Sequence, residues 1–531
     1  MTRIHAGLPG LVLLCGLQLA VAEAVRADAP GRSLRPQVRP ASITSMATRV
    51  AAARPVDVAP PTPGAPASAD AGEVARAALR AIEVTRNANP RAPALPRGNA
   101  TDELSNVIAV TARESEAHAP VTLVRRSLRP RLRPANLAEA PRRAAAAAAP
   151  APQAVPAALQ ADFNRWIAGF RGRALSAGVS GAVFDRAFAG VEYLPQVVKR
   201  DGNQSEFTTS TGDYLSRAVS DSRVRNGRAA AAEQAGRLNA IAARYDVPGH
   251  YVAAVWGMES NYGANRGNTP LISALATLAH DGRRGAFFEK QLIAALKILQ
   301  NGDVRPEDMT GSWAGAMGHT QFIPTSYAAY AVDFTGDGRR DIWSDDPTDA
   351  LASTAAYLAK AGWIPNMPWG VEVIVPRDFN FALAHGPKKM PSEWERLGLR
   401  AADGGRLRDH GSAKLLLPSG AQGVAFLTFR NFDVIKRYNN SDAYALGVGH
   451  LGDRIAGAGP LKGSWPEGDH RLKRAEREEV QRLLARRGFD PGGVDGRLGP
   501  NSIRAIRAFQ SSAGLVPDGH PSVPLLQALR R

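Results

Sequence analysis

The composition of the chain changes abruptly near residue 156, and this change separates a part that can bury a core from a part that cannot. Residues 25–155 contain 19 arginines, no lysine and 10 acidic residues, and prolines recur through them. They show little apolar periodicity, so burial cannot offset the entropy of ordering them. We therefore expect residues 25–155 to be disordered and the folded domains to lie in residues 156–531.

The first 24 residues have the pattern of a secretory signal peptide. Arg3 and His5 precede an apolar run over residues 8–22, and residues 22–24 (Ala-Glu-Ala) provide a cleavage site. The run is short for a membrane span of about 20 residues, and an uncleaved anchor is the alternative. The only cysteine, Cys15, lies inside this run, so the exported chain would have no disulfide or thiolate site.

The arginine-rich segment carries one short motif twice. Residues 33–40 read Ser-Leu-Arg-Pro-Gln-Val-Arg-Pro, and residues 127–134 read Ser-Leu-Arg-Pro-Arg-Leu-Arg-Pro. The repeat is either arginine-rich low complexity or a docking element for an acidic partner or an anionic surface. The formal charge of +17 would also suit nucleic acid, but export argues against such a partner.

Residues 156–458 carry helical periodicity with one strand-like interval. Phe163, Trp166, Ile167 and Phe170 recur at the spacing of one buried helix face. β-Branched and aromatic residues predict strands over residues 371–375, 414–417 and 424–429. We therefore expect a mainly α domain with a small β lobe. A Gly/Pro-rich linker follows at residues 459–471, and residues 472–531 predict a three-helix module with helices at 476–487, at 501–511 and after Pro524.

A single glutamate lies in the most apolar helical segment of this region. Val252, Val255, Trp256 and Glu259 follow one another at i, i+3, i+4 and i+7, which places Glu259 on the apolar face of a helix. Burial disfavours a charged carboxylate, so we predict a raised pKa and a group able to protonate a leaving oxygen. The alternative is a buried glutamate held in a structural hydrogen-bond network.

A glycine-rich loop over residues 312–327 is the second feature with chemical content. Its glycines allow the backbone to approach a ligand closely, and the amide of Gln321 can both donate to and accept from an acetamido group. Residues 258–263 read Met-Glu-Ser-Asn-Tyr-Gly, and residues 314–324 read Ala-Gly-Ala-Met-Gly-His-Thr-Gln-Phe-Ile-Pro. Together with residues 333–343 and 437–444, these ordered motifs resemble the membrane-bound lytic transglycosylase B family of murein-degrading enzymes, over residues 160–460.

The resemblance implies a lysozyme-like helical fold with a small β lobe, and Glu259 as the only acid/base. It implies an Arg283–Arg284 pair that meets the peptide or lactyl carboxylates of the substrate, and Tyr214 as a more loosely aligned cleft residue. The remaining residues that it places along the sugar subsites are Ser312, Gln321, Phe322, Tyr357, Tyr438, Asn439 and Tyr444.

The reaction implied by the resemblance is non-hydrolytic. Glycosidases that use water usually need two carboxylates, and the nearest other acid, Asp281, is better explained as part of a solvated turn. Glu259 would cleave the MurNAc–GlcNAc bond and leave a 1,6-anhydro end, in the periplasm of a Gram-negative bacterium, with peptidoglycan strands as partner. A hydrolytic muramidase and a non-catalytic wall-binding scaffold are the alternatives.

Residues 333–341 follow the start of an EF-hand loop. Asp333, Thr335 and Asp337 would supply side-chain oxygens and Arg339 its carbonyl. The twelfth position is a serine, so the resemblance implies closure by Asp349, with residues 345 and 346 as fallback. We expect a structural Ca²⁺ that the reaction does not require; a metal-free turn is the alternative. Residues 472–531 resemble the peptidoglycan-binding domain family.

Overall fold

The computed structural model describes residues 155–202 and 209–531. The predicted signal peptide, the arginine-rich segment and its repeated motif lie outside these residues and stay predictions. Most regular structure in the described part is helical, as expected. No helix in this part is long and apolar enough to cross a bilayer.

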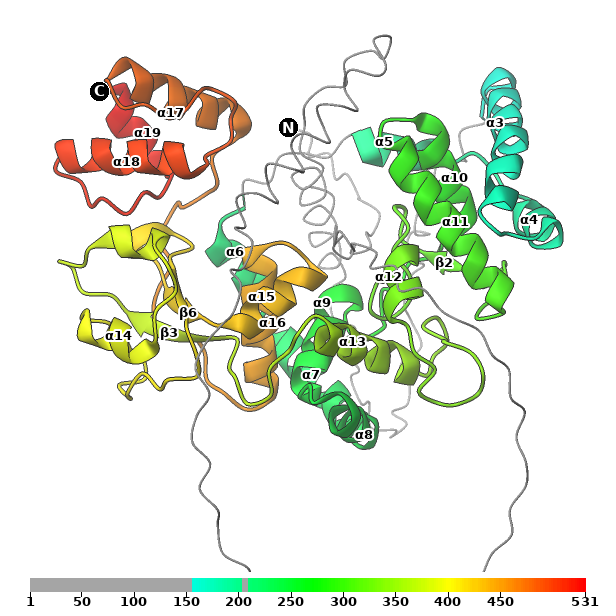
Figure 1. Cartoon of the computed structure of the whole chain (residues 1–531), viewed down its shortest axis with the longest axis horizontal. Coiled ribbons are helices and arrows are strands. Elements are labelled where there is room, and N and C mark those ends of the chain that lie inside the picture. The colour runs from blue at the N-terminus through cyan, green and yellow to red at the C-terminus, as the bar shows by residue number, and fades with distance from the viewer. Residues whose placement is uncertain (1–154, 203–208) are drawn as a thin grey trace, which may run out of the picture. The chain divides into compact units, whose positions relative to one another are not determined.

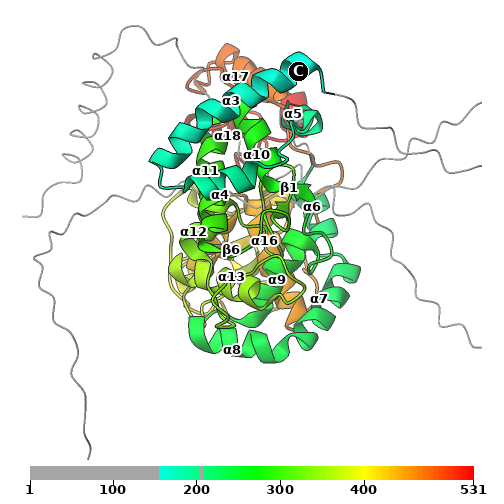
Figure 2. The same cartoon turned by 90° about the vertical axis from the view of Figure 1, so that its right-hand side faces the viewer.

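The domain begins with the helix predicted from the aromatic spacing. Helix α3 (Ala157–Ser176) buries Phe163 and Phe170, and Trp166 stacks on Phe170 at 5.2 Å. Helices α3 and α4 cover the pair formed by α10 and α11 (Figure 2). The bounds of the other helices in this layer are α4 (Gly181–Phe188), α5 (Pro195–Gly202), α10 (Leu271–Asp281) and α11 (Gly285–Asn301).

Helix α9 (Gly249–Ser260), which carries Glu259, is the central helix of the domain (Figure 1). The predicted burial of Glu259 with Val252, Val255 and Trp256 is confirmed, and the burial extends around the helix, because every residue from Tyr251 to Ser260 is buried. Helices on several sides exclude water from it. The helices packed against it are α7 (Asp221–Glu233), α8 (Ala235–Tyr245), α13 (Thr348–Lys360) and α16 (Asp442–Ile455). The other elements of the domain are α6 (Thr211–Ala218), α12 (Pro324–Tyr330), α15 (Arg430–Tyr438), β1 (Thr269–Pro270) and β2 (Thr310–Gly311).

The small β lobe is a four-stranded antiparallel sheet with the order β4-β3-β6-β5. The three predicted strands are confirmed as β3 (Gly370–Ile374), β5 (Lys414–Leu416) and β6 (Ala425–Thr428). The fourth, β4 (Arg400–Ala401), is too short to leave a periodic signal. Trp394 is fully buried in the separate core of the lobe. The short helices there are α14 (Pro391–Arg396), η1 (Phe381–His385) and η2 (Gly420–Gln422).

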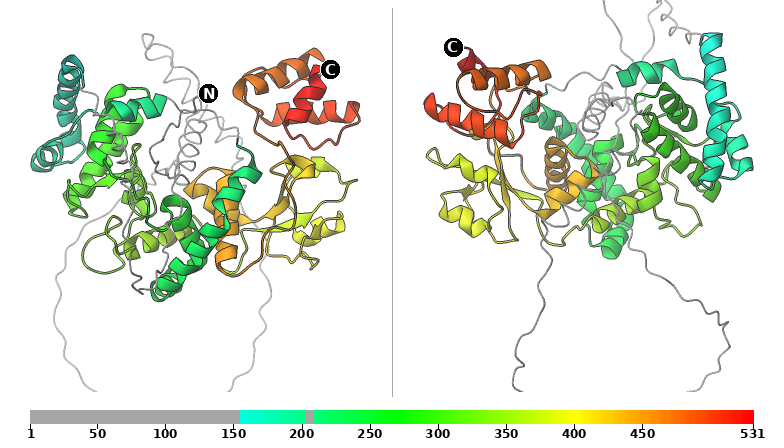
Figure 3. Two further views of the ribbon diagram at one scale, coloured as in Figure 1. Left: turned by 180° about the vertical axis from the view of Figure 1, so that it is seen from behind. Right: turned by 45° about the horizontal axis from the view of Figure 1, so that its top comes forward.

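The C-terminal module has three helices, as predicted (Figure 3): α17 (Arg474–Arg486), α18 (Pro500–Ser512) and α19 (Val523–Arg530). Val480 and Ile506 are fully buried in their shared core. The buried amide of Gln481 accepts hydrogen bonds from the backbone of Asp495 and Gly496. This side chain fixes the turn that connects the first two helices.

Candidate active site

The carboxyl group of Glu259 lies inside the protein against a phenol. Glu259 is fully buried near the C-terminal end of α9, and Tyr444 is buried in the first turn of α16. The Tyr444 hydroxyl donates a hydrogen bond of 2.5 Å to Oε1 of Glu259. Burial favours the neutral acid over the carboxylate, and a phenol donor stabilises the carboxylate once it forms. A group in this setting can give up a proton and take one back.

The glycine-rich loop is folded on itself by Ser312. The Ser312 Oγ accepts a hydrogen bond from the backbone N–H of Ala316 at 3.0 Å, and the Ser312 N–H donates to the Ala316 carbonyl at 2.7 Å. A Cβ at Gly315, where φ is 96°, would lie 2.6 Å from Leu275. The buried side chain of Ser312 therefore shapes the loop through the backbone, a role that the resemblance alone did not indicate.

Gln321 adopts a left-handed backbone conformation, with φ of 53°. Its Nε2 donates to the carbonyls of Gly318 and Arg266 at 2.8 and 3.0 Å. Its buried Oε1 has no hydrogen-bond partner among residues 155–202 and 209–531. A strained backbone and an unsatisfied buried acceptor are costly, and both are typical of a residue held ready for a ligand.

Phe322, Tyr357 and Tyr438 form one packed aromatic cluster. The ring centroids of the two tyrosines lie 4.9 Å apart, and Phe322 lies 5.8 Å from Tyr438. The Tyr357 hydroxyl donates to the Arg437 carbonyl at 2.5 Å, and the Tyr438 hydroxyl donates to the Thr320 carbonyl at 2.6 Å. All three rings are buried. In this conformation Tyr357 and Tyr438 pack against Phe322 of the glycine-rich loop, and Tyr438 also binds the loop backbone.

Two further predicted residues, Asn439 and Tyr214, lie next to helix α16, which carries Tyr444. Asn439 is buried directly after α15, and its Oδ1 has no partner within the described ranges. Tyr214 is half-buried on α6, and its ring approaches Gly447 on α16. Both residues therefore border the helix that carries the partner of Glu259.

Arg283 and Arg284 converge on a carboxylate of the protein, Asp201. The buried Asp201, on α5, accepts hydrogen bonds from Nε of Arg283 at 2.8 Å and from Nη2 of Arg284. The structure thus shows both arginines bound to a protein carboxylate, and their predicted contact with substrate carboxylates stays a prediction. Sequence reasoning missed Asp201, because no local motif connects it to arginines more than 80 positions later. Asp281, at the end of α10, is exposed, as a solvated turn requires.

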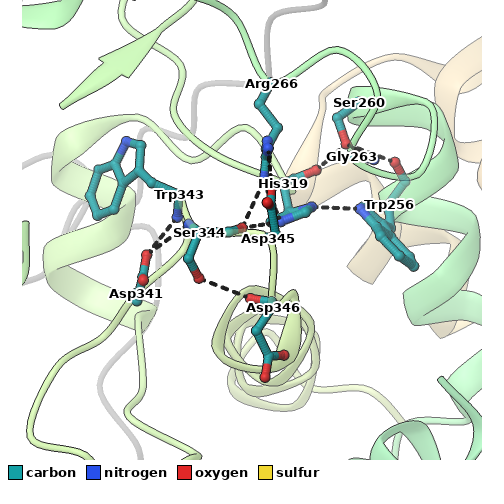
Figure 4. Close-up of polar contacts among 10 residues, drawn as sticks. All are labelled: Trp256, Ser260, Gly263, Arg266, His319, Asp341, Trp343, Ser344, Asp345 and Asp346. Carbon is teal, nitrogen blue, oxygen red and sulfur yellow. Dashed lines mark hydrogen bonds and ion pairs between the residues drawn. The ribbon is translucent and has the colours of Figure 1, made fainter. Parts of the chain in front are cut away.

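Sequence reasoning made no prediction for His319, a residue of the glycine-rich loop whose ring the structure places between α9 and residues 341–346 (Figure 4). Its ring lies 3.1 Å from the indole Nε1 of Trp256, and its carbonyl accepts a 2.5 Å hydrogen bond from Ser260. These contacts connect the residue after Glu259 to the loop that carries Gln321. A buried histidine in the middle of the loop motif was the only available signal.

Three acids of the EF-hand-like segment come together. Carboxylate oxygens of Asp333, Asp337 and Asp349 all lie within 4.8 Å of one another. Burial raises the pKa of Asp349, although backbone N–H groups of Thr335, Phe334 and Asp341 oppose this. The predicted fallback acids lie elsewhere, since Asp345 pairs with Arg266 and Asp346 with Arg237. Thr335 donates to Asp333 at 3.3 Å, and the backbone N–H of Arg339 donates to Asp337.

A model of the family described as "Transglycosylase SLT domain" matches residues 162–453, more than half of the chain. The chain belongs to this family. The predicted resemblance is thereby confirmed, and a second model, "Putative peptidoglycan binding domain", matches residues 473–529 of this SLT-family chain.

Named relatives agree with this assignment. The chain is 33% identical over 250 residues to "Membrane-bound lytic murein transglycosylase B" of Escherichia coli K12; the match spans 46% of this chain and 66% of the relative, just under two thirds. It is 51% identical to crystal structures of SltB3 from Pseudomonas aeruginosa. One, in complex with NAG-anhNAM-pentapeptide, has a TM-score of 0.67 and matches 70% of this chain and 99% of SltB3. The other, with NAG-NAM-pentapeptide, has a TM-score of 0.66 and matches 69% and 99%.

Proposed function

We propose that this chain is a lytic transglycosylase that cleaves the β-1,4 bond between MurNAc and GlcNAc in peptidoglycan, with Glu259 as its single acid and base. The observation that carries the proposal is the fully buried carboxyl group of Glu259 and its hydrogen bond from Tyr444. Family membership and the peptidoglycan-binding module support the choice of substrate. The two SltB3 crystal structures hold muropeptides of this class.

The reaction needs two proton transfers, one from Glu259 to the leaving oxygen and one from the substrate back to Glu259. Glu259 protonates the glycosidic oxygen, the bond from C1 of MurNAc to that oxygen breaks, and GlcNAc leaves with a free 4-hydroxyl. The substrate's own 2-acetamido group stabilises the cationic C1. The Glu259 carboxylate, which the Tyr444 hydroxyl stabilises in the meantime, then removes the proton of the 6-hydroxyl as its oxygen attacks C1. The product is a 1,6-anhydro ring, and no water is consumed.

The variant Glu259→Gln tests the acid and separates an enzyme from a scaffold, because it keeps the shape of the side chain but cannot transfer a proton. Release of soluble muropeptides from purified sacculi should fall by at least about 1,000-fold, as expected when the only acid and base is lost. Binding of the variant to sacculi should be unchanged. A non-catalytic scaffold would release nothing in either form, and full activity of the variant would refute the assignment of Glu259.

The three-acid cluster fits a calcium ion. Ca²⁺ binds oxygens at about 2.3–2.6 Å, so ligand oxygens up to 4.8 Å apart can share one ion. A buried carboxylate such as Asp349 is costly without a cation. Asp333, Asp337 and Asp349 would hold the ion, together with Thr335 and the Arg339 carbonyl. The ion would neutralise and cross-link the loop, and no step of the reaction uses it.

The remaining proposals concern where the enzyme works. The signal-like residues 1–24 support export to the periplasm, and residues 473–529 support attachment to glycan strands. The basic residues 25–155 would contact the anionic wall or another cell-wall enzyme. A truncation that removes residues 25–155 should therefore weaken sacculus binding at low salt and leave cleavage of soluble strands intact.

A further inference from the structure

His319 is a buried histidine whose two ring nitrogens contact different segments of the protein. Nδ1 lies 3.1 Å from the indole Nε1 of Trp256, on α9, and Nε2 lies 2.7 Å from the backbone carbonyl of Ser344. The ring is also in edge contact with the Trp256 indole, with centroids 5.7 Å apart. Figure 4 shows the ring between these two partners.

The partners determine the protonation state of this ring. An indole N–H can only donate, so Nδ1 must accept and carries no proton. A carbonyl can only accept, so Nε2 carries the proton and donates to Ser344. Burial lowers the pKa of His319 and nearby Arg266 acts in the same direction, while the Ser344 carbonyl opposes them. A second proton on Nδ1 would place two N–H donors against each other.

The backbone of His319 binds the end of the catalytic helix. Its carbonyl accepts a 2.5 Å hydrogen bond from Oγ of Ser260, which also accepts from the N–H of Gly263 at 2.9 Å. The fit is close, because a Cβ at Gly263 would lie 2.6 Å from Nδ1 of His319. Trp256 and Ser260 stand three residues before and one residue after Glu259, so His319 contacts the turn of α9 that orients the acid.

Arg266 connects His319 and Ser344 to Gln321 of the glycine-rich loop. Its Nη1 donates to the Ser344 carbonyl at 2.6 Å and its Nη2 donates to Asp345 at 2.7 Å. Nη1 also lies 3.1 Å from Nε2 of His319, but both atoms carry hydrogens in the derived tautomer, so this contact is not a hydrogen bond. The carbonyl of Arg266 accepts from Nε2 of Gln321.

We propose that His319, as the neutral Nε2–H tautomer, is a positioning residue that fixes the orientation of Glu259 relative to Gln321. The proposal rests on the proposed function of Glu259. The charged and polar side chains that act on the ring are Trp256 from α9, Arg266 from the following loop, and Asp341 and Asp345 from the segment between Asp337 and Asp349. Among residues 155–202 and 209–531, only the Trp256 indole and the Ser344 carbonyl form hydrogen bonds with the ring nitrogens of His319.

Kinetics of three variants on soluble glycan strands test this role. His319→Phe keeps the ring and removes both hydrogen bonds, and its kcat should fall by about 10- to 100-fold, because a misplacement of about 1 Å costs about 100-fold. Its KM should change by less than about 3-fold. His319→Asn restores an acceptor near the position of Nδ1, so it should recover at least about 5-fold of the lost kcat. The control His280→Asn removes a histidine that pairs with Asp162 on α3, and its kcat should stay at the wild-type value.

Three results would overturn the proposal: wild-type kcat in His319→Phe, equal losses in the Phe and Asn variants, or a loss confined to KM. If His319→Phe does not fold, Trp256→Phe removes the indole donor instead. Its kcat should fall by a similar factor, and an unchanged kcat would refute the proposal. Wild-type enzyme that forms no anhydro ends would refute the proposed function, whereas anhydro ends with His319-independent kcat would refute only the positioning role.

Discussion

The Tyr444 hydroxyl and Oε1 of Glu259 lie 2.5 Å apart, although 185 positions separate the two residues in the chain. The contact exists because α9 and α16 pack directly against each other. A carboxyl group that must lose a proton inside the protein and recover it needs a partner for the charged state. The phenol provides that partner.

Tyr444→Phe should therefore slow the reaction without preventing folding. Loss of a hydrogen bond to a charged group costs about 1.5–3 kcal/mol, which corresponds to a reduction in kcat of about 10- to 100-fold. The rate of muropeptide release from sacculi checks this. Tyr251→Phe is the matched control, because it removes a buried phenol of the same α9–α16 pair that binds Asp453. The control should lower the melting temperature and keep kcat; equal kcat in both variants would exclude the role of Tyr444.

Gln321→Leu removes the amide whose Oε1 lacks a partner in the described part of the chain. If this oxygen accepts a hydrogen bond from a substrate amide, KM for soluble strands should rise by about 10-fold, equivalent to about 1.4 kcal/mol. Gln291→Leu is the control, since the buried Oε1 of Gln291 is already occupied by Thr325. The control should lose stability with unchanged KM. An unchanged KM in Gln321→Leu would remove this residue from the substrate site.

Calcium should stabilise the catalytic domain through the three-acid cluster. At a concentration 100 times its Kd, a ligand adds about 2.7 kcal/mol to stability, or roughly 5–10 °C in melting temperature for a domain of this size. Asp337→Asn should abolish the response to calcium and to chelator. Asp345→Asn should retain it, because Asp345 pairs with Arg266 outside the cluster. A chelator without effect on the wild-type melting temperature would contradict the site.

His450 should make the domain sensitive to acid. Burial, helped by Arg454, lowers the pKa of His450 to about 4, against about 6.5 in an unfolded chain. The unfolded state therefore binds more protons between these values, so stability is complete above pH 6.5 and is lost as the pH falls toward 4. The loss should reach about 3 kcal/mol. Urea unfolding across this range should show a flatter profile for His450→Gln, and the wild-type profile for the exposed control His470→Gln.

The sequence predicted best those helices and strands whose apolar spacing is visible within the element itself. The spacing of Phe163 and Phe170 was enough to predict α3, and alternating β-branched residues predicted β3. The three helices of the C-terminal module followed from the same logic. Helix α9 was predicted in place but with one apolar face, because neighbours from distant parts of the chain bury its other side.

The site residues that belong to sequence motifs were predicted. Those that join the site through contacts between distant parts of the chain were missed. Glu259 and Gln321 belong to ordered motifs, so their neighbourhood could be anticipated. Asp201 meets Arg283 and Arg284 only in the folded chain. His319 has no role that its neighbours in sequence could reveal, because its partners Trp256 and Ser344 come from other loops and helices.

We propose that one buried carboxyl group, that of Glu259, cleaves the glycan without water. Mass spectrometry of the strand ends released from purified sacculi tests it most directly, with Glu259→Gln beside the wild type. We expect the wild type to release MurNAc ends that lack one water, in their 1,6-anhydro form, and Glu259→Gln to release no new ends. Reducing, hydrated MurNAc ends from the wild type would contradict it.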